Sequence, residues 1–382
     1  MKAWPKVALG SVLRTYIDAV PSIQLDSVNL AGIYGFGRGL FQRGPISPLD
    51  TTYKAFHRLN AGDFVISSPK AWEGAVARIP EEFDGWFLSS VFPTFRADKQ
   101  QLDTRYLDWY CKRDAVWRQL QGKAKGMGAR RESVSPAQFL SLEIPLAPLA
   151  EQQAIVARLN LLAEKTRQLE AHLDAADNAS AALLLSLHHQ LGADRKISLG
   201  EIIELHEIAE PIKVEGQYLQ VGVRGFGGGL FAKSAIAGSD TAYKSFNRLY
   251  TDAIVLSQVK GWEGAIALCP AELDGMFVSP EYRTFRCKPI EASPAYLGEL
   301  FRTEWFWSQL QEATRGVGAR RERTRPEQFL KIQLPMPELV DQLKIAKILA
   351  KQVPLKAKHT AIRAANAALL PATLERIFQQ AH

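Results

Sequence analysis

The chain has 382 residues, of which 47% are hydrophobic, and a formal net charge of +7 with a pI near 9.2. This hydrophobic content excludes a disordered chain and supports about two to three domains of ordinary size. No window reaches the apolar length of a membrane span, so we expect a cytoplasmic protein, and the basic charge suits a polyanion such as nucleic acid.

The sequence repeats itself at a distance of 190 residues, without a gap from near Lys6 to about Leu159. Within residues 32–96, 32 of 65 positions are identical in the second copy, so we expect a duplicated domain and not a solenoid of short repeats. The predicted organisation is a first domain at 1–148, a helical segment at 149–192, a second domain at 193–338 and a helical segment at 339–382.

Each copy begins with a mixed region, so the predicted fold class is α+β. Short strands are expected at 63–67 and 86–89, where apolar residues lie between glycine and proline turns. A helix is expected at 103–120, capped by Asp103 or Thr104. Further on, 135–138 has the pattern of a capping box that opens a short helix.

The first helical segment carries a four–three repeat that predicts a coiled-coil seam. The second segment is less regular, and Pro354 and Pro371 predict a break followed by a helix that kinks or ends near Pro371. We expect the two segments to pair as antiparallel helices with one domain at each end, related by a pseudo-twofold axis. The alternative is that each helix packs on its own domain. The predicted seam of the first segment comprises Ile155, Leu159, Leu162, Thr166, Leu169, Leu173, Ala176, Ser180, Leu183 and Leu187.

Motifs for catalysis are missing from both copies. The glycine-rich segment 35–39 lacks the Lys-Ser/Thr of a P-loop, and no motif of an amino methyltransferase accompanies it. Asp50 and Lys54 have no second acid nearby that would complete a nuclease site. The three cysteines form no C-x-x-C pair, which favours packing roles in a reducing compartment. We therefore expect no catalytic residue, metal site or cofactor in this chain.

A basic and aromatic set does recur, and it includes Trp72 and Trp262, which are either core or contact residues. Lys and Arg neutralise phosphates, while Arg pairs with guanine and Asn or Gln with adenine. Recurring DNA-binding candidates are Lys54, Arg58, Lys70, Arg130 and Arg131, matched by Lys244, Arg248, Lys260, Arg320 and Arg321. Candidates for different base preferences are Arg38 against Gly228, Gln42 against Ala232, His57 against Asn247 and Ser68 against Gln258.

This arrangement resembles the specificity subunit of type I restriction–modification systems. The resemblance rests on Gly-Ala-Arg-Arg-Glu at 128–132 and 318–322, on the Lys-Ala-Trp-Glu-Gly-Ala segment at 70–75, and on Glu-Gln-Gln at 151–153. A long helical segment follows each of the two domains. Asp-Gln-Leu at 341–343 departs from the usual Glu-Gln-Gln.

The resemblance implies two target-recognition domains that each read half of a bipartite DNA site, with paired helices that fix the spacer between the halves. It also implies two partner methyltransferase subunits that bind S-adenosylmethionine, and possible motor–nuclease subunits. The same kind of subunit serving a type II or phage-defence methyltransferase is an open alternative, as is a coiled-coil scaffold that binds only protein. A self-sufficient enzyme is the least favoured alternative.

Overall fold

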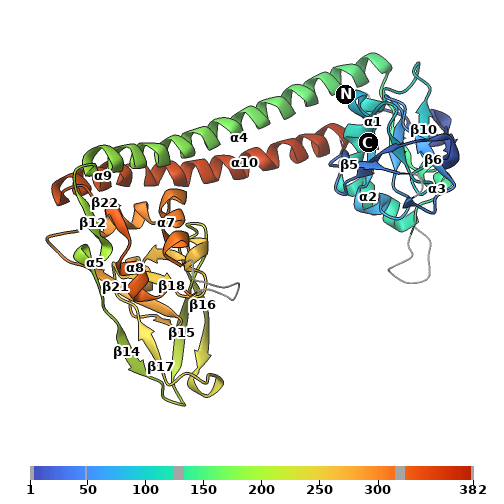
Figure 1. Cartoon of the computed structure of the whole chain (residues 1–382). Coiled ribbons are helices and arrows are strands. Elements are labelled where there is room, and N and C mark those ends of the chain that lie inside the picture. Colours follow the sequence, from blue (N-terminus) through green and yellow to red (C-terminus); the bar gives the residue numbers. More distant parts are fainter. Residues whose placement is uncertain (1–3, 48–49, 124–132, 315–322, 380–382) are drawn as a thin grey trace. The chain divides into compact units, whose positions relative to one another are not determined.

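The computed structural model describes residues 4–47, 50–123, 133–314 and 323–379 (Figure 1). It divides into two compact units, Met1–Ala171 with Ala361–His382 and His172–Thr360, which we call unit 1 and unit 2. Each unit holds one globular α+β domain, called domain 1 or domain 2, together with parts of both long helices. Residue 361 lies 190 positions after residue 171, so the unit boundary itself follows the sequence repeat.

The described residues of domain 1 form three small sheets whose strands are joined by turns, loops and 3-10 helices. A five-stranded sheet has the order β3 (Asp18–Pro21), β6 (Ala55–Arg58), β9 (Phe87–Leu88), β4 (Val28–Ile33) and β5 (Leu40–Ile46). A four-stranded sheet has the order β2 (Leu13–Thr15), β10 (Thr94–Ala97), β7 (Phe64–Ile66) and β8 (Val76–Arg78). The third sheet pairs β1 (Lys6–Ala8) with β11 (Glu143–Pro145).

Domain 2 repeats these three sheets with the same strand orders. Its five-stranded sheet runs β14 (Ile208–Pro211), β17 (Ser245–Arg248), β20 (Phe277–Val278), β15 (Gln217–Val223) and β16 (Leu230–Ala237). Its four-stranded sheet runs β13 (Ile203–Leu205), β21 (Tyr282–Cys287), β18 (Ile254–Ser257) and β19 (Ile266–Leu268). The remaining pair is β12 (Lys196–Ser198) with β22 (Gln333–Pro335). The duplication of the sequence is therefore a duplication of topology.

The helix predicted at 103–120 is two helices, because the chain turns at Lys112 and Arg113. Asp103 caps the first of them, and its carboxylate accepts a hydrogen bond from the backbone N–H of Arg105. The capping box at Ser135 and Gln138 is also confirmed. The short helices of domain 1 are α1 (Thr104–Cys111), α2 (Asp114–Lys123) and α3 (Pro136–Leu140); those of domain 2 are α5 (Leu199–Ile202), α6 (Pro294–Leu300), α7 (Glu304–Thr314) and α8 (Pro326–Leu330).

The first long helix, α4 (Leu149–Gly192), is continuous, whereas the second is divided into α9 (Leu339–Ala350) and α10 (Val353–Gln379). The predicted break before Pro354 is confirmed. The helix does not end near Pro371, which lies inside α10. Pro371 has no backbone N–H, so the carbonyl four residues earlier loses its usual helical donor.

The helices α4 and α10 lie antiparallel within each unit (Figure 1). In unit 1 the Asn366 amide donates to the Thr166 carbonyl at 3.0 Å and to Glu170 at 2.7 Å, and Arg363 donates to Glu170 at 2.6 Å. The Asn366 amide, followed by Arg363, holds the pKa of Glu170 below its ordinary value. Polar side chains therefore join the two helices at this level.

Unit 2 uses other polar pairs for the same purpose. His359 Nδ1 lies 2.8 Å from the Asp177 carboxylate, and the Ser180 hydroxyl is hydrogen-bonded to Gln352. The predicted four–three repeat holds at five positions that are buried or half-buried: Leu159, Thr166, Leu173, Ser180 and Leu187. At three alternate positions the predicted residues, Leu169, Ala176 and Leu183, are exposed, and the residue that is buried or faces the partner helix is the next one along the chain, Glu170, Asp177 or Leu184. Ile155 and Leu162 are half-buried beside Val156 and Ala163.

The incoming end of a long helix completes the core of each domain. Leu374 and Phe378 of α10 join the core of domain 1, where the Phe378 ring lies 5.4 Å from Tyr106 and 5.1 Å from Tyr110. At the equivalent places of α4, Leu184 joins the core of domain 2 and His188 lies against Tyr296. The helices pair as expected, and the end of each one packs on the domain at the other end of the pair and not only on the domain that it follows in the chain.

Candidate nucleic-acid interface

Each five-stranded sheet carries an exposed basic and aromatic set at the start and end of its second strand. In domain 1, Tyr53, Lys54 and Arg58 are exposed, and the Tyr53 ring packs edge-on against the buried Phe56 at 5.8 Å. The Arg58 guanidinium lies over Phe87, 5.7 Å from its ring centroid. The backbone beneath is fixed, because Ser22 donates to the Lys54 carbonyl through both its N–H and its hydroxyl.

Domain 2 presents the same set at equivalent positions. Tyr243, Lys244 and Arg248 are exposed, and Tyr243 lies 6.1 Å from the buried Phe246. The Lys244 carbonyl accepts a hydrogen bond from Ile212, as the Lys54 carbonyl does from Ser22. Two copies of one solvent-facing cationic set can contact two stretches of a polyanion in the same manner.

The candidates His57 and Asn247 point into their domains and are buried. His57 Nδ1 lies 3.1 Å from the Phe92 carbonyl, and the Asn247 amide donates to the Tyr282 carbonyl at 3.2 Å. These two carbonyls occupy equivalent places in the copies, so His and Asn are two solutions to one structural hydrogen bond. In the described conformation neither side chain is presented for contact with a base.

Lys70 and Lys260 are exposed, but each already faces a carboxylate. Lys70 Nζ lies 2.6 Å from Glu73, and Lys260 Nζ lies 3.6 Å from Glu263. The Lys70 ammonium also lies 5.5 Å from the centroid of the Trp72 ring, whose Nε1 donates to the Pro69 carbonyl. The charge of each of these two lysines is partly neutralised by the neighbouring glutamate, whereas no such ion pair of Lys54 or Lys244 is found among the described residues.

Four predicted arginines, Arg130, Arg131, Arg320 and Arg321, lie outside the described residues. The described residues that follow them lie beside the loops of Lys70 and Lys260. There the Val134 N–H donates to the Ser68 carbonyl, and the Thr324 N–H donates to the Gln258 carbonyl. Gln258 is half-buried. Arg38 and Gln42 are exposed on the hairpin formed by β4 and β5.

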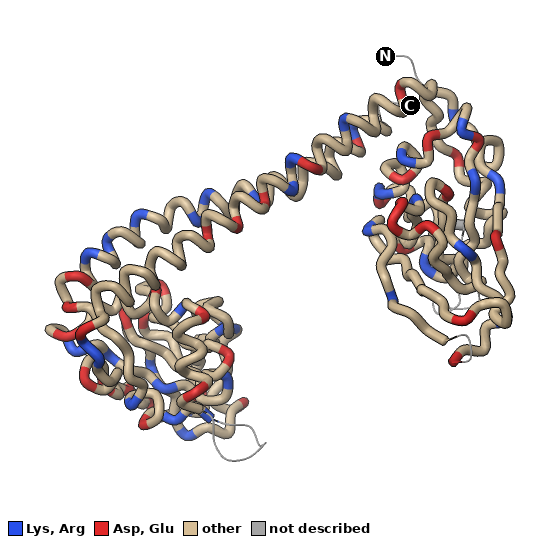
Figure 2. The backbone as a smooth tube through the Cα atoms, turned by 45° about the horizontal axis from the view of Figure 1, so that its top comes forward, with Lys and Arg blue, Asp and Glu red and all other residues tan. Residues whose placement is uncertain are grey.

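Basic and acidic residues are interspersed along the long helices and in both globular domains (Figure 2). Within the described ranges, no group of three or more His, Cys, Asp or Glu side chains could hold a metal ion. Burial raises the pKa of the Cys269 and Cys287 thiols to about 12 and that of Cys111 further still, so these thiols stay protonated near neutral pH. No helix among the parts that the structure describes is long and apolar enough to cross a membrane.

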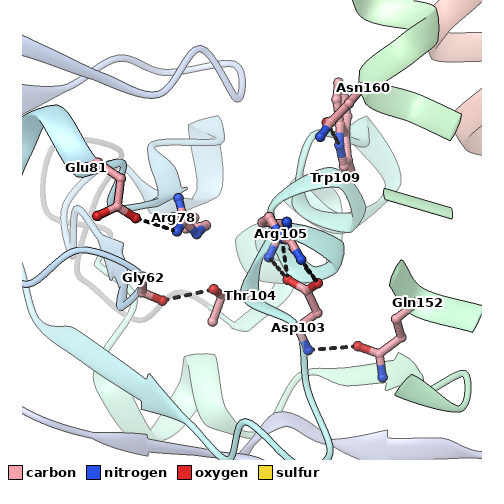
Figure 3. Close-up of polar contacts among 9 residues, drawn as sticks. All are labelled: Gly62, Arg78, Glu81, Asp103, Thr104, Arg105, Trp109, Gln152 and Asn160. Atoms are coloured by element: carbon pink, nitrogen blue, oxygen red, sulfur yellow. Dashed lines mark hydrogen bonds and ion pairs between the residues drawn. The ribbon is translucent and has the colours of Figure 1, made fainter. Parts of the chain in front are cut away.

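Sequence reasoning missed the role of one glutamine at the start of each long helix. Gln152 is fully buried; it accepts a hydrogen bond from the Asp103 N–H at 2.9 Å and donates to the Gln101 and Ala147 carbonyls, both at 2.8 Å. Figure 3 shows Gln152 beside Asp103, with Trp109 and Asn160 joined one level further along the helix.

Gln342 repeats this arrangement in domain 2. It accepts from the Ser293 N–H at 2.9 Å and donates to the Glu291 and Pro337 carbonyls at 3.1 and 2.9 Å. The glutamine is the residue that 151–153 and 341–343 share at their second position, and that agreement was the signal in the sequence. The glutamine joins the start of the long helix to the loop that precedes α1 or α6. Asp-Gln-Leu at 341–343 differs from Glu-Gln-Gln but keeps this glutamine and its hydrogen bonds.

No family model matches the sequence, and no curated protein matches it either. Solved structures do resemble it in fold. The HsdS subunit from Thermoanaerobacter tengcongensis matches with 18% identity and a TM-score of 0.56, covering 99% of this chain and 96% of the other. A chain from a structural study of complex assembly and conformational transition of the type I R-M system matches with 18% identity and a TM-score of 0.64, covering 100% and 97%. The chain therefore has the fold of these proteins over nearly its whole length.

Proposed function

We propose that this chain is a specificity subunit of a type I restriction–modification system. The observation that carries this proposal is the exposed Tyr-Lys-Arg set, built twice on the same strands of two like domains. Two such modules suit a bipartite DNA site, with one half-site for each domain. The likeness in fold to type I R-M structures supports the same conclusion.

In this proposal the chain binds double-stranded DNA and performs no chemistry itself. Two partner methyltransferase subunits bind S-adenosylmethionine and methylate adenine, and restriction subunits join them where the system cleaves DNA. The long helices expose apolar side chains that partner subunits would cover in this proposal. They include Leu161, Leu169, Leu183, Ile362 and Leu369.

The proposal is tested by measuring binding of the purified full chain to random-sequence duplex DNA at several salt concentrations. We expect affinity to fall steeply with salt, because lysine and arginine side chains displace counterions from phosphates. Methyl transfer to DNA is expected only after the modification subunits are added. Salt-independent binding, or methylation by the chain alone, would contradict the proposal; a protein-binding scaffold would show no DNA binding at all.

A further inference from the structure

The hairpins β4–β5 and β15–β16 are similar exposed segments of the two domains, yet they differ in their charged side chains. Residues 34–43 and 224–233 share six of ten positions, including the glycines and both phenylalanines. The four differences are Tyr34 against Arg224, Arg38 against Gly228, Gln42 against Ala232 and Arg43 against Lys233. All eight side chains or positions are exposed at the surface.

Each hairpin turn is held in a strained conformation. Phe36 and Phe226 have φ values of 60° and 54°, in the left-handed region that non-glycine residues rarely adopt, and they are 64% and 70% exposed. Their backbone N–H groups donate to the carbonyls of Glu73 at 2.7 Å and Glu263 at 2.8 Å. The turn is thus fastened to the body of the domain, so its surface side chains are presented by a rigid ribbon.

The aromatic ring at the base of each hairpin lies over a glycine. A Cβ atom on Gly32 would lie 2.4 Å from the Phe41 ring, and one on Gly222 would lie 2.7 Å from the Phe231 ring. Glycine is required there because the ring occupies the space of a side chain. Both domains therefore build the same platform, and they differ only in what lies on it.

In domain 1 the platform carries two further layers. Tyr34 stacks on Phe41 with ring centroids 4.2 Å apart, and the Arg38 guanidinium lies over Tyr34 at 4.8 Å. Arg38 Nε donates to the Gly35 carbonyl, which fixes the plane of the guanidinium.

In domain 2 the guanidinium takes the lower layer. Arg224 lies directly over Phe231 at 4.4 Å, in the place that Tyr34 occupies in domain 1, and the Lys233 ammonium lies 5.7 Å from the same ring. Among the described residues, no carboxylate forms an ion pair with Arg38 or Arg224. Each guanidinium therefore keeps its charge and its outer N–H groups for a ligand.

We propose that these two hairpins enter the DNA major groove and that Arg38 and Arg224, held on their aromatic platforms, each read a guanine at a different position of the two half-sites. This inference rests on the proposed function. The major groove admits a two-stranded β-ribbon, and bidentate pairing of arginine with guanine O6 and N7 is a common specific contact. Stacking on a ring orders the guanidinium before binding, which lowers the entropy lost on contact.

The test converts one hairpin into the other in the full-length chain. Tyr34→Arg, Arg38→Gly, Gln42→Ala and Arg43→Lys give domain 1 the hairpin of domain 2, and Glu81→Ala, another exposed change to the residue of domain 2, is the control. Each protein selects from a duplex library with randomised half-sites, and the enriched bases are sequenced. We expect the fourfold variant to replace the guanine preference of half-site 1 with that of half-site 2, while half-site 2 is unchanged.

A single Arg38→Lys variant keeps the charge and loses the bidentate geometry. We expect its preference for guanine to fall about tenfold or more, with affinity for random DNA nearly unchanged and melting temperature retained. If the fourfold variant enriches the same two words as the original chain, the hairpins do not read DNA and the inference fails, while the proposed function stands. If the original chain enriches no word and binds no DNA, the proposed function fails as well.

Discussion

Domains 1 and 2 share every sheet and the glutamine that anchors each helix, but they fill the space beside that helix differently. In domain 1 the Trp109 indole donates to Asn160 of α4 at 3.0 Å. At the equivalent places domain 2 has Glu299 and Ala350, which line a groove of about 440 Å³ between α6 and α9. The contrast shows that the repeated fold tolerates a groove beside the helix in one copy, while both copies keep the hydrogen bonds of the buried glutamine, Gln152 or Gln342.

The largest expected effect comes from breaking that shared anchor. Gln152→Ala or Gln342→Ala leaves one N–H and two carbonyls, buried or partly buried, without their partner, at about 4 kcal/mol of unfolding free energy for either unit. Hydrogen exchange of α1 and α6 amides measures each unit separately. The exposed neighbours Gln153→Ala and Leu343→Ala serve as controls with little effect. A large loss in one unit and none in the other would show that the anchors are not equivalent.

A second pair of variants sharpens the comparison of the helix ends. Leu184 is 3% exposed in the core of domain 2, whereas its neighbour Leu183 is 43% exposed. Leu184→Ala should cost about 3 kcal/mol, and Leu183→Ala less than about 1 kcal/mol, because only the first leaves a cavity. Thermal unfolding with a probe in domain 2 distinguishes them. Equal losses would favour the seam predicted from the sequence.

The seam of α4 separates the features that the sequence predicts from those that it does not. The duplication, the α+β class, both capping residues and the break before Pro354 followed from local patterns. The seam positions Leu169, Ala176 and Leu183 did not, because the helices meet there through their neighbours, among them Glu170 and Asp177 with their polar partners. Pairing of a charged side chain with a residue nearly 200 positions away leaves no periodic signal in one helix.

The candidate site was predictable in composition and less so in geometry. Both copies expose Lys54 or Lys244 as the recurrence suggested, since a shared strand position fixes a shared orientation. His57 and Asn247 differ in sequence yet make the same internal hydrogen bond, so a difference between copies was not a sign of exposure. Exposure depends on whether the face of the strand that carries the side chain is covered, and in β6 the consecutive residues Phe56 and His57 are both buried.

The helix ends also predict a difference in pH dependence between the units. Burial, and then the nearby His189, lower the pKa of His188 to about 4. The pKa of His188 in the folded protein is therefore below its value of about 6.5 in an unfolded chain. The contribution of neutral His188 to the stability of unit 2 is fully present above pH 6.5 and is lost as the pH falls towards 4. About 2 kcal/mol of it is lost by pH 5.

Domain 1 has Phe378 at the equivalent position, which does not titrate. We expect His188→Phe to remove most of the loss in unit 2 between pH 7 and pH 5, as followed by hydrogen exchange in α6. Phe378→His should introduce a similar loss into unit 1, measured in α1. An unchanged pH profile in both variants would show that His188 is not the titrating group.

The smallest expected effect tests whether both domains bind DNA in the same pose. Lys54 and Lys244 are exposed on equivalent strand ends, and each has its carbonyl held by a hydrogen bond from the neighbouring segment. If each ammonium neutralises one phosphate, Lys54→Ala and Lys244→Ala should each reduce the salt slope of binding by about one unit, and the double variant by about two. Sequence preference should not change, because phosphate contacts carry no base information. Binding isotherms over a range of salt concentrations measure this, with Lys99→Ala, an exposed lysine outside the recurring set, as the control. A reduced slope for only one of the two single variants would mean that the equivalent lysines meet DNA differently, and the shared pose would have to be abandoned.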